Sequence, residues 1–137
     1  MTMTEFIFPV RVYYEDTDVA GVVYYANYLR FIERGRTEWL RTIGVDQTLL
    51  FEQELAFVVT EVNIKYINAA RFNAMMEVVT TVQPAGKASM LFKQHIRDKE
   101  NKEHIYCRAE VKAACIDMKS LKPKPLPKIL VKELMSE

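Results

Sequence analysis

The chain contains few of the residues on which metal and nucleotide-cofactor sites usually depend. Its 137 residues include four glycines, two cysteines and two histidines. The glycines stand far apart, so they form neither a dinucleotide-binding fingerprint nor a Walker-type phosphate loop, which need several glycines close together. A zinc site is also disfavoured, because it draws most of its ligands from histidine and cysteine. We therefore expect no metal and no cofactor.

Long apolar runs and an excess of one charge are missing as well. The chain has 19 Lys and Arg residues and 18 Asp and Glu residues, so its net charge is +1. Typical nucleic-acid binders have a strong excess of basic residues. The best apolar run, Leu55 to Val59, is much shorter than the ~20 residues of a membrane span. The N-terminus lacks the basic start and apolar core of a signal peptide. We expect a cytoplasmic protein with no nucleic-acid partner and no membrane insertion.

The length and composition are those of one globular domain, residues 1–137. Half of the residues are hydrophobic and 27% are charged, which is ordinary for a folded domain. A chain of this size buries roughly two-thirds of its unfolded surface, so it needs no disulfide to fold. Cys107 and Cys115 lie in one apparent strand and, at about 3.4 Å per residue, are roughly 27 Å apart, too far for a disulfide. We expect both to be free, buried residues of a reducing compartment.

The spacing of the apolar residues changes along the chain and predicts the order of the elements. Residues 6–14 alternate between two faces, as a strand does. From about Ala26 to Ile43 the apolar positions recur at helical spacing, which predicts one long amphipathic helix ended by Gly44. A tail rich in Lys and Pro closes in a short helix from about Ile129. Between them the alternating pattern predicts four more strands, at residues 60–66, 76–82, 90–96 and 105–115.

This order of elements favours an α+β fold over a parallel, doubly wound sheet. Consecutive strands joined by short connections pair in antiparallel fashion, and no helices alternate with the last four strands. One long helix must then cover most of the apolar face of five strands. We expect a five-stranded antiparallel sheet wrapped around one long central helix.

The densest cluster of functional groups comes just before the long helix. Glu15, Asp16 and Asp18 fall within four residues. One interpretation is an acidic capping turn near the positive end of the helix dipole. The other is catalytic, because the first N–H groups of a helix lack intrahelical partners and would polarise a carbonyl oxygen docked there. A carboxylate beside that carbonyl could attack it or activate water.

A longer stretch around these acids, residues 13–41, closely resembles the hotdog-fold acyl-CoA thioesterases. It begins Tyr-Tyr-Glu-Asp-Thr-Asp-Val-Ala-Gly-Val-Val-Tyr-Tyr-Ala-Asn. The bacterial family associated with the Tol–Pal gene cluster, relatives of 4-hydroxybenzoyl-CoA thioesterase, resembles the chain most. Support continues in residues 56–59, 66–71 and 114–117. The resemblance implies a hotdog fold and a homodimer with joined sheets, often a homotetramer of two such dimers.

The resemblance also assigns roles by position. Asp18 matches the catalytic aspartate, which acts as nucleophile or as general base on water, and the Tyr25 backbone N–H matches the donor to the thioester carbonyl. Gly21, with Val22 beside it, lets the loop pass close to the substrate. The chain departs from the family at two positions, where it has Tyr25 for His and Ala69 for Pro. The first change removes a titratable side chain, whereas the backbone donor does not depend on side-chain identity.

Three residues of the helix region have two interpretations each. Glu33 could be a second carboxylate near the site, since some relatives place their catalytic acid on this helix, or a glutamate in water or paired with arginine. Tyr24 and Tyr28 could line an acyl pocket, although aromatics at helical spacing more often belong to the core. Glu15 and Asp16 are expected to shape the loop.

Lysines and histidines elsewhere carry weaker signals. Lys87, in the Gly-Lys turn, together with Lys119 and Lys122, could hold the phosphates of coenzyme A at the dimer surface, although scattered surface lysines usually have no specific role. His95 and His104 belong to no motif, and we expect each to be an exposed strand residue rather than a base.

These observations predict an acyl-CoA thioesterase that releases free acid and CoA. No strong general acid is needed, because a thiol with a pKa of ~8.5 leaves readily near neutral pH. Alternatives are a thioesterase acting on acyl carrier protein, a hotdog dehydratase, and a non-catalytic acyl-CoA-binding or scaffold protein that docks to phospholipid-synthesis enzymes. The dehydratase is disfavoured because neither histidine lies near the helix-start motif. The presence of Asp18 argues against the last alternative, because a non-catalytic binding protein needs no carboxylate opposite the backbone amide that would polarise a carbonyl.

Overall fold

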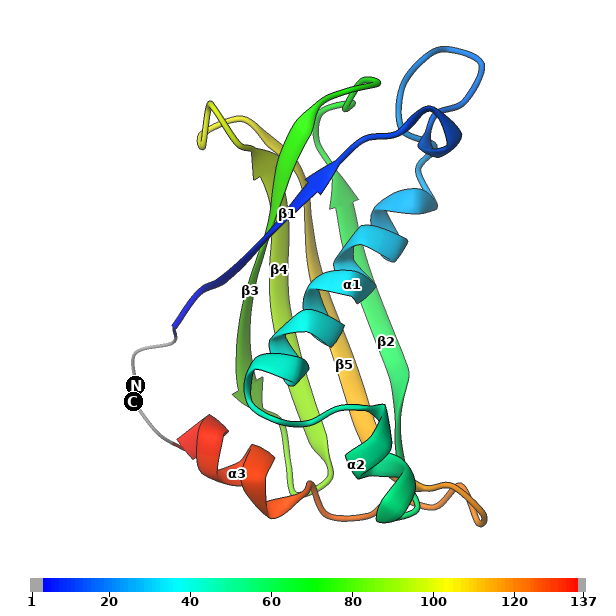
Figure 1. The fold of residues 1–137 in the computed structure, drawn as a ribbon, viewed down its shortest axis with the longest axis vertical. Helices are drawn as coiled ribbons and strands as arrows, with labels where there is room; N and C mark the ends of the chain where they lie inside the picture. The colour runs from blue at the N-terminus through cyan, green and yellow to red at the C-terminus, as the bar shows by residue number, and fades with distance from the viewer. Residues whose placement is uncertain (1–3, 136–137) are drawn as a thin grey trace.

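The computed structural model describes residues 4–135, and in them one antiparallel sheet surrounds one long helix (Figure 1). The elements are, in chain order, β1 (Phe6–Arg11), a 3-10 turn (Tyr14–Asp16), α1 (Asn27–Thr42), α2 (Gln47–Glu52), β2 (Leu55–Tyr66), β3 (Met75–Pro84), β4 (Ser89–Asp98), β5 (Ile105–Asp117) and α3 (Lys128–Met135). The predicted α+β class, antiparallel sheet and central helix are confirmed.

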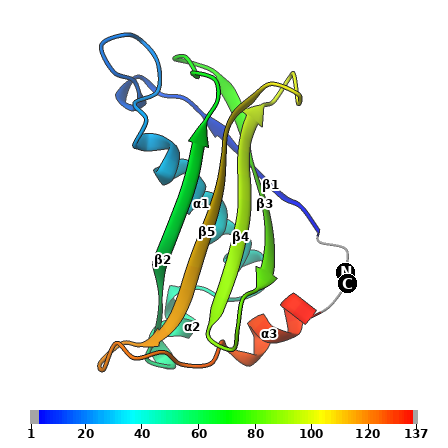
Figure 2. The ribbon, with the colours of Figure 1, turned by 180° about the vertical axis from the view of Figure 1, so that it is seen from behind.

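The strands lie in the order β1-β3-β4-β5-β2, so β1 and β2 form the two edges. Strands β3, β4 and β5 are joined by hairpins, whereas β2 crosses to the far edge and pairs with β5. Helix α1 packs on β1, β3 and β4 and leaves β2 largely uncovered. Figure 2 shows the same sheet from its outer face, with α1 behind it.

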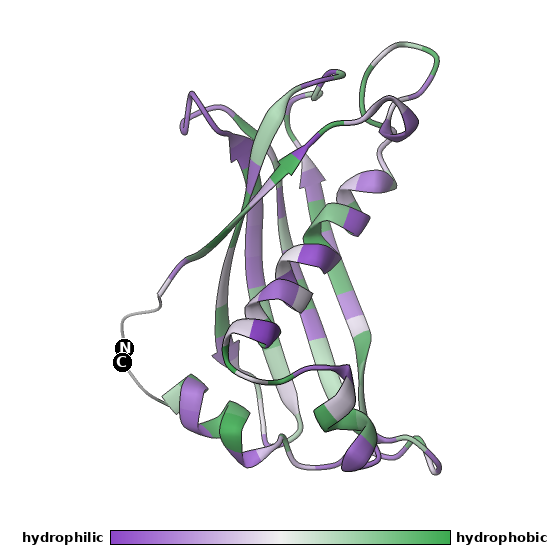
Figure 3. Cartoon of the chain, in the orientation of Figure 1, coloured by the Kyte–Doolittle hydropathy of each residue, from purple (hydrophilic) through white to green (hydrophobic). Residues whose placement is uncertain are grey.

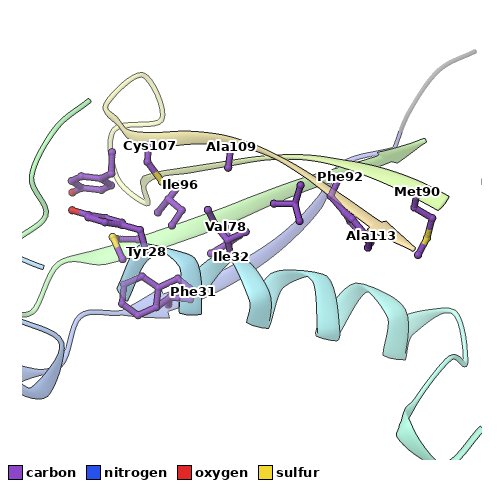
Figure 4. Close-up of a cluster of buried hydrophobic side chains, with 14 of the residues drawn as sticks. Tyr28, Phe31, Ile32, Val78, Met90, Phe92, Ile96, Cys107, Ala109 and Ala113 are labelled. Atoms are coloured by element: carbon purple, nitrogen blue, oxygen red, sulfur yellow. The ribbon is translucent and has the colours of Figure 1, made fainter. Parts of the chain in front are cut away.

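The core forms where α1 meets the inner face of the sheet. Tyr28, Phe31 and Ile32 of α1 are buried and point toward the strands (Figure 4). Their partners from the sheet alternate with outward-facing residues, many of them polar, as is typical of a half-buried sheet, and Figure 3 shows the alternation of colour. These partners include Val78, Met90, Phe92, Ile96, Cys107, Ala109 and Ala113.

Three differences from the predictions exceed two residues or concern a whole element. Strand β1 ends at Arg11, because the 3-10 turn begins at Tyr14. Helix α2 was not predicted; its N-terminus is capped by the Asp46 side chain, which accepts a hydrogen bond from Leu49 N at 2.9 Å. Strand β2 begins at Leu55 rather than at Thr60. Its register shifts between Val59 and Glu61, so the alternation of inward and outward side chains changes phase inside the strand. The sequence pattern therefore did not reveal the first half of the strand.

Cys107 and Cys115 are both free and fully buried, as predicted. Burial raises the pKa of the Cys107 thiol to about 12, against a small lowering by a hydrogen bond with the Ile96 backbone. Burial also raises the pKa of Cys115, against the nearby Lys124. Both groups therefore stay protonated near neutral pH, and the thiolate is the reactive form.

We expect neither cysteine to react with a disulfide reagent in the native protein during a ten-minute assay, and both to react in denaturant. The measurement is the absorbance of the released chromophore with and without guanidinium. Fast labelling of one thiol in the native state would contradict the burial of that thiol. The result has a practical use, because protein thiols then add no background when free CoA is measured with the same reagent.

Candidate active site

The loop between β1 and α1 folds into a small hairpin that presents Asp18. Asp18 N donates to Val22 O at 2.9 Å, and Gly21 N donates to Asp18 O at 3.0 Å. Gly21 has a φ of +79°, a left-handed conformation that a glycine adopts without cost. The turn from Asp18 to Val22 is therefore closed by the backbone, and its tip extends into solvent.

The base of this hairpin is fixed to the start of α1. The backbone oxygen of Asp16 accepts from Tyr24 N at 3.0 Å and from Asn27 Nδ2 at 2.9 Å. Val23 is buried, and its N–H donates to Ala70 O at 2.8 Å. Loop and helix start are thus held together by the segment after β2, and Figure 1 shows the loop between β1 and α1 at one end of the molecule.

The Asp18 carboxylate is accessible. Its Oδ1 accepts from Ala20 N at 2.9 Å, and its side chain has no other hydrogen bond or ion pair within residues 4–135. Asp16 differs, because its Oδ2 accepts from Tyr13 N at 2.8 Å within the loop. Asp16 therefore shapes the loop, as expected, while Asp18 keeps an oxygen available for chemistry.

Two backbone donors stand free beside this loop. The N–H groups of Tyr25 and of Ala26, the N-cap of α1, donate to no protein acceptor in the described part of the chain. The next amides are occupied, since Asn27 N donates to Tyr24 O and Tyr28 N to Tyr25 O. Free amides at the positive end of a helix are suited to bind a carbonyl oxygen that gains negative charge.

Aromatic side chains connect this end of α1 to the end of β2. The ring of Tyr25 lies 5.0 Å from that of Tyr24 and 5.9 Å from that of Tyr66, the second pair edge to face. Tyr28 also contacts Tyr66, and its hydroxyl accepts from Ala70 N at 3.0 Å. Tyr28 is 3% exposed and belongs to the core, while Tyr24 and Tyr25 are exposed. Tyr66 was not predicted as a site residue.

A groove of about 350 Å³ lies farther along α1, between that helix, α2 and the start of β2. Glu33 and Arg36 are on its wall, and the Asp18 loop does not line it. The structure therefore places Glu33 in this groove and not beside Asp18. Arg36 donates to Gln94 Oε1 at 3.3 Å and lies over the Phe92 ring. Burial lowers the pKa of Arg36, and the charge of Glu33 opposes that shift.

The three lysines lie at the other end of the sheet. Leu126 N donates to Lys87 O, and Asp117 N to Lys122 O, so the β3–β4 turn and the segment after β5 adjoin. Lys119 Nζ pairs with Glu54 at 3.0 Å. Figure 1 shows this end near α2 and α3, opposite the loop that carries Asp18. Within one chain the lysines and Asp18 do not form one site.

The histidines differ from the expectation of exposed strand residues. His95 is half-buried in β4, and His104 is half-buried in the turn before β5, outside a strand. Strand alternation does not report contacts between side chains, such as the His104 ring, which lies 5.0 Å from that of Tyr106. Among residues 4–135 no group of three or more His, Cys, Asp or Glu residues could hold a metal ion. No helix in that range is long and apolar enough to cross a membrane.

Comparison with known proteins gives consistent matches in sequence and in structure. Residues 12–134 match the thioesterase-like superfamily. The acyl-CoA thioesterase YbgC of Haemophilus influenzae is 48% identical over 90% of this chain and 89% of its own, and the acyl-CoA thioester hydrolase YbgC of Escherichia coli is 43% identical over 97% and 98%. The 1,4-dihydroxy-2-naphthoyl-CoA thioesterase Slr0204 of Synechocystis is 23% identical, with a TM-score of 0.89 over 96% of both chains. These matches confirm the predicted family and the hotdog fold.

Proposed function

The chain belongs to the thioesterase-like superfamily, and from that premise we propose that it hydrolyses acyl-CoA thioesters to a free acid and CoA. The observation that carries the proposal is the pairing of an accessible Asp18 carboxylate with the free amides of Tyr25 and Ala26 at one end of α1. The two relatives named as acyl-CoA thioester hydrolases, at 43% and 48% identity, support the substrate class.

In this proposal the thioester carbonyl oxygen binds at the Tyr25 amide. Asp18 supplies the attack on the carbonyl carbon, directly or by taking a proton from water that attacks. The negative charge that develops on the carbonyl oxygen is stabilised by the amide and by the helix dipole. The tetrahedral intermediate then expels CoA as a thiolate. No metal and no cofactor take part, and the reducing environment inferred from the free cysteines fits a cytoplasmic enzyme.

The two routes of attack differ in where oxygen from water goes. If Asp18 is the nucleophile, an acyl-aspartyl anhydride forms, and its hydrolysis in ¹⁸O-water transfers the label to the aspartate when water attacks that carbonyl. If Asp18 is a general base, the label enters the free acid alone. Label in the peptide with Asp18 after many turnovers, measured by mass spectrometry, would identify Asp18 as the nucleophile.

A second copy of the chain completes the proposed enzyme. Strand β2 is an edge of the sheet with unpaired backbone groups and exposed apolar side chains, which favours pairing with another strand. We propose a homodimer joined at this edge, in which the lysine end of one subunit serves the Asp18 end of the other; two dimers would form a homotetramer. Val59, Val62, Tyr66 and Ile67 are exposed along or just beyond the strand.

The proposed activity is tested by a free-thiol assay on a series of acyl-CoA esters, from acetyl to palmitoyl and benzoyl. Turnover that survives dialysis against EDTA supports a metal-independent thioesterase. If only acyl groups attached to acyl carrier protein were hydrolysed, the substrate would be a protein-bound thioester and not an acyl-CoA. Tight binding of all esters without turnover would favour an acyl-CoA-binding or scaffold protein, with phospholipid-synthesis enzymes as partners to test.

The lysines give a prediction with a defined kinetic signature. If Lys87 and Lys122 hold CoA phosphates, changing either to Gln should raise KM by about three- to fivefold and leave kcat unchanged, because surface ion pairs contribute up to about 1 kcal/mol and are lost equally from ground and transition states. Lys119→Gln should have a smaller effect, since its amine is shared with Glu54. Lys99→Gln, in the β4–β5 turn, is the control. Unchanged KM in all variants would exclude this role.

A further inference from the structure

The outer face of the sheet carries charged side chains in transverse rows, and most charged residues that lie opposite each other have opposite signs. Glu61 of β2 lies opposite Lys112 of β5, and Lys93 of β4 lies opposite Glu110 of β5. Glu77 of β3 pairs with Arg97 of β4 at 3.0 Å. Side chains directly opposite each other on one face interact, and opposite charges there are stabilising.

One row breaks this rule. Lys65 of β2 lies opposite Arg108 of β5, and Arg108 lies opposite His95 of β4. The row continues through Val79 of β3 to Ile7 of β1, so it contains no acidic residue. Like charges opposite one another destabilise a sheet. Sequences tend to break such local rules at functional sites.

The cations of this row also lack partners. Neither Lys65 nor Arg108 forms an ion pair or a side-chain hydrogen bond within the described residues, although ion pairs form elsewhere on the sheet. The row borders a surface hollow of about 510 Å³ whose floor includes Val79. Glu5 and Glu110 also line this hollow, against the cations Lys65, Lys93 and Arg108, and the balance is positive.

We propose that Lys65, Arg108 and His95 form a binding site for a phosphate-class anion on the outer face of the sheet. A tetrahedral dianion would accept hydrogen bonds from the Arg108 guanidinium and the Lys65 amine, and from His95 when the ring is protonated. The hollow beside this row is lined neither by the Asp18 loop nor by the lysines near α2. It lies on the face shown in Figure 2, on the side of β4, β5 and β2 away from α1.

His95 makes this binding depend on pH. Burial lowers the pKa of His95, the charge of Arg97 lowers it further, Glu5 raises it and Arg108 lowers it. Lys93 lies two positions along the same strand, and Val79 is the neighbour from β3. The ring is therefore largely neutral at neutral pH, and a bound dianion must raise its pKa. By linkage, affinity for the anion should rise as pH falls through the range where His95 gains its proton.

The two histidines provide the test and its internal control. The pKa of each ring is measured by NMR in the full chain, in sodium chloride and in sodium sulfate at matched ionic strength, because sulfate keeps its charge across the titration. We expect sulfate to raise the pKa of His95 and to leave that of His104 unchanged. Lys65→Gln should weaken sulfate binding, measured as the sulfate concentration that gives half of the pKa shift, by about three- to fivefold, as for loss of a surface ion pair. Lys112→Gln, whose lysine lies on the same face opposite Glu61, should not.

The source of the anion is distinguished by two further arms. Inorganic phosphate added to the free protein should shift the backbone amides of the Lys65–Arg108–His95 row. Vesicles of anionic phospholipid, compared with zwitterionic vesicles, show whether a lipid headgroup is bound by the same residues. An equal sulfate effect on both histidines, or one that persists in Lys65→Gln, would overturn the proposal. The proposal would also be overturned if Arg108→Gln dissociated the oligomer and left anion binding unchanged. That result would show that this face is an interface between copies of the chain.

Discussion

Replacing Asp18 by Asn should lower kcat about a hundredfold to ten-thousandfold on every acyl-CoA that the protein hydrolyses, the range for loss of a general base or nucleophile. The variant keeps the fold of the loop, because Asn Oδ1 still accepts from Ala20 N, the one side-chain bond that Asp18 makes in residues 4–135. The change therefore removes charge and basicity without removing an anchor. The measurement is the steady-state rate of CoA release, with circular dichroism to verify folding.

Glu15→Gln is the matched control for that experiment. Glu15 is an exposed acid of the same loop, three residues earlier, and its replacement also removes one negative charge near the helix start. We expect this variant to stay within about threefold of the original rate, since a screened charge on the surface contributes little. A comparable loss in both variants would mean that loop charge, not the Asp18 oxygen, supports turnover. Retained activity in Asp18→Asn would remove Asp18 from the mechanism.

Replacing Tyr25 by Phe separates the role of its backbone N–H from the role of its side chain. In Tyr25→Phe the amide remains, and so does the edge-to-face contact with Tyr66. A catalytic role of the amide alone therefore implies a kcat close to that of the unchanged protein. The side chain at this position is a phenol without a ring nitrogen, so it offers no imidazole for proton transfer. The hydroxyl of Tyr25 is then dispensable for the carbonyl interaction that we propose.

The parts of the fold that follow from local patterns were predictable. The sixteen residues of α1 repeat an apolar stripe for four turns, and the observed bounds differ from the predicted ones by one residue at each end. The motif around Asp18 is equally local, because loop, turn glycine and helix start are consecutive in sequence. Short elements behave differently. Helix α2 has six residues, too few for a clear period, and it depends on the Asp46 cap and on burial of Leu50.

Long-range pairing could not be predicted from the pattern. Alternation in residues 60–66 indicates a strand but does not say which neighbour it takes, and β2 pairs with β5, which follows it by about forty residues. The contact of Tyr66 with Tyr25 depends on that pairing, so no sequence signal identified Tyr66 as part of the site. For the same reason the cationic row of Lys65, Arg108 and His95 appears only when three strands are set in register.

Replacing Gly35 by Ala should destabilise the fold by about 1–3 kcal/mol, the usual cost of inserting a methyl group into a packed core. A Cβ at Gly35 would lie 2.7 Å from Val78 Cγ1 and 3.3 Å from both Gln94 Nε2 and Thr80 Oγ1. Gln94 donates from this same nitrogen to Ile32 O and to Thr80 Oγ1, each at 3.0 Å, so the methyl group also disturbs a buried polar network. The measurement is urea unfolding of the variant and of the original protein.

Helix propensity predicts the opposite sign, which makes the experiment decisive. Glycine in a helix interior costs about 1 kcal/mol relative to alanine, so with free space the variant would gain stability. The difference in stability between Thr37→Gly and Thr37→Ala, at an exposed position of the same helix, measures that propensity without the clash. In the pair Gly35→Ala with Val78→Ala the clash is relieved, and the combined loss should be smaller than the sum of the single losses. A stabilised Gly35→Ala, or additive losses, would show that α1 does not lie against β3 as closely as the 2.7 Å approach indicates.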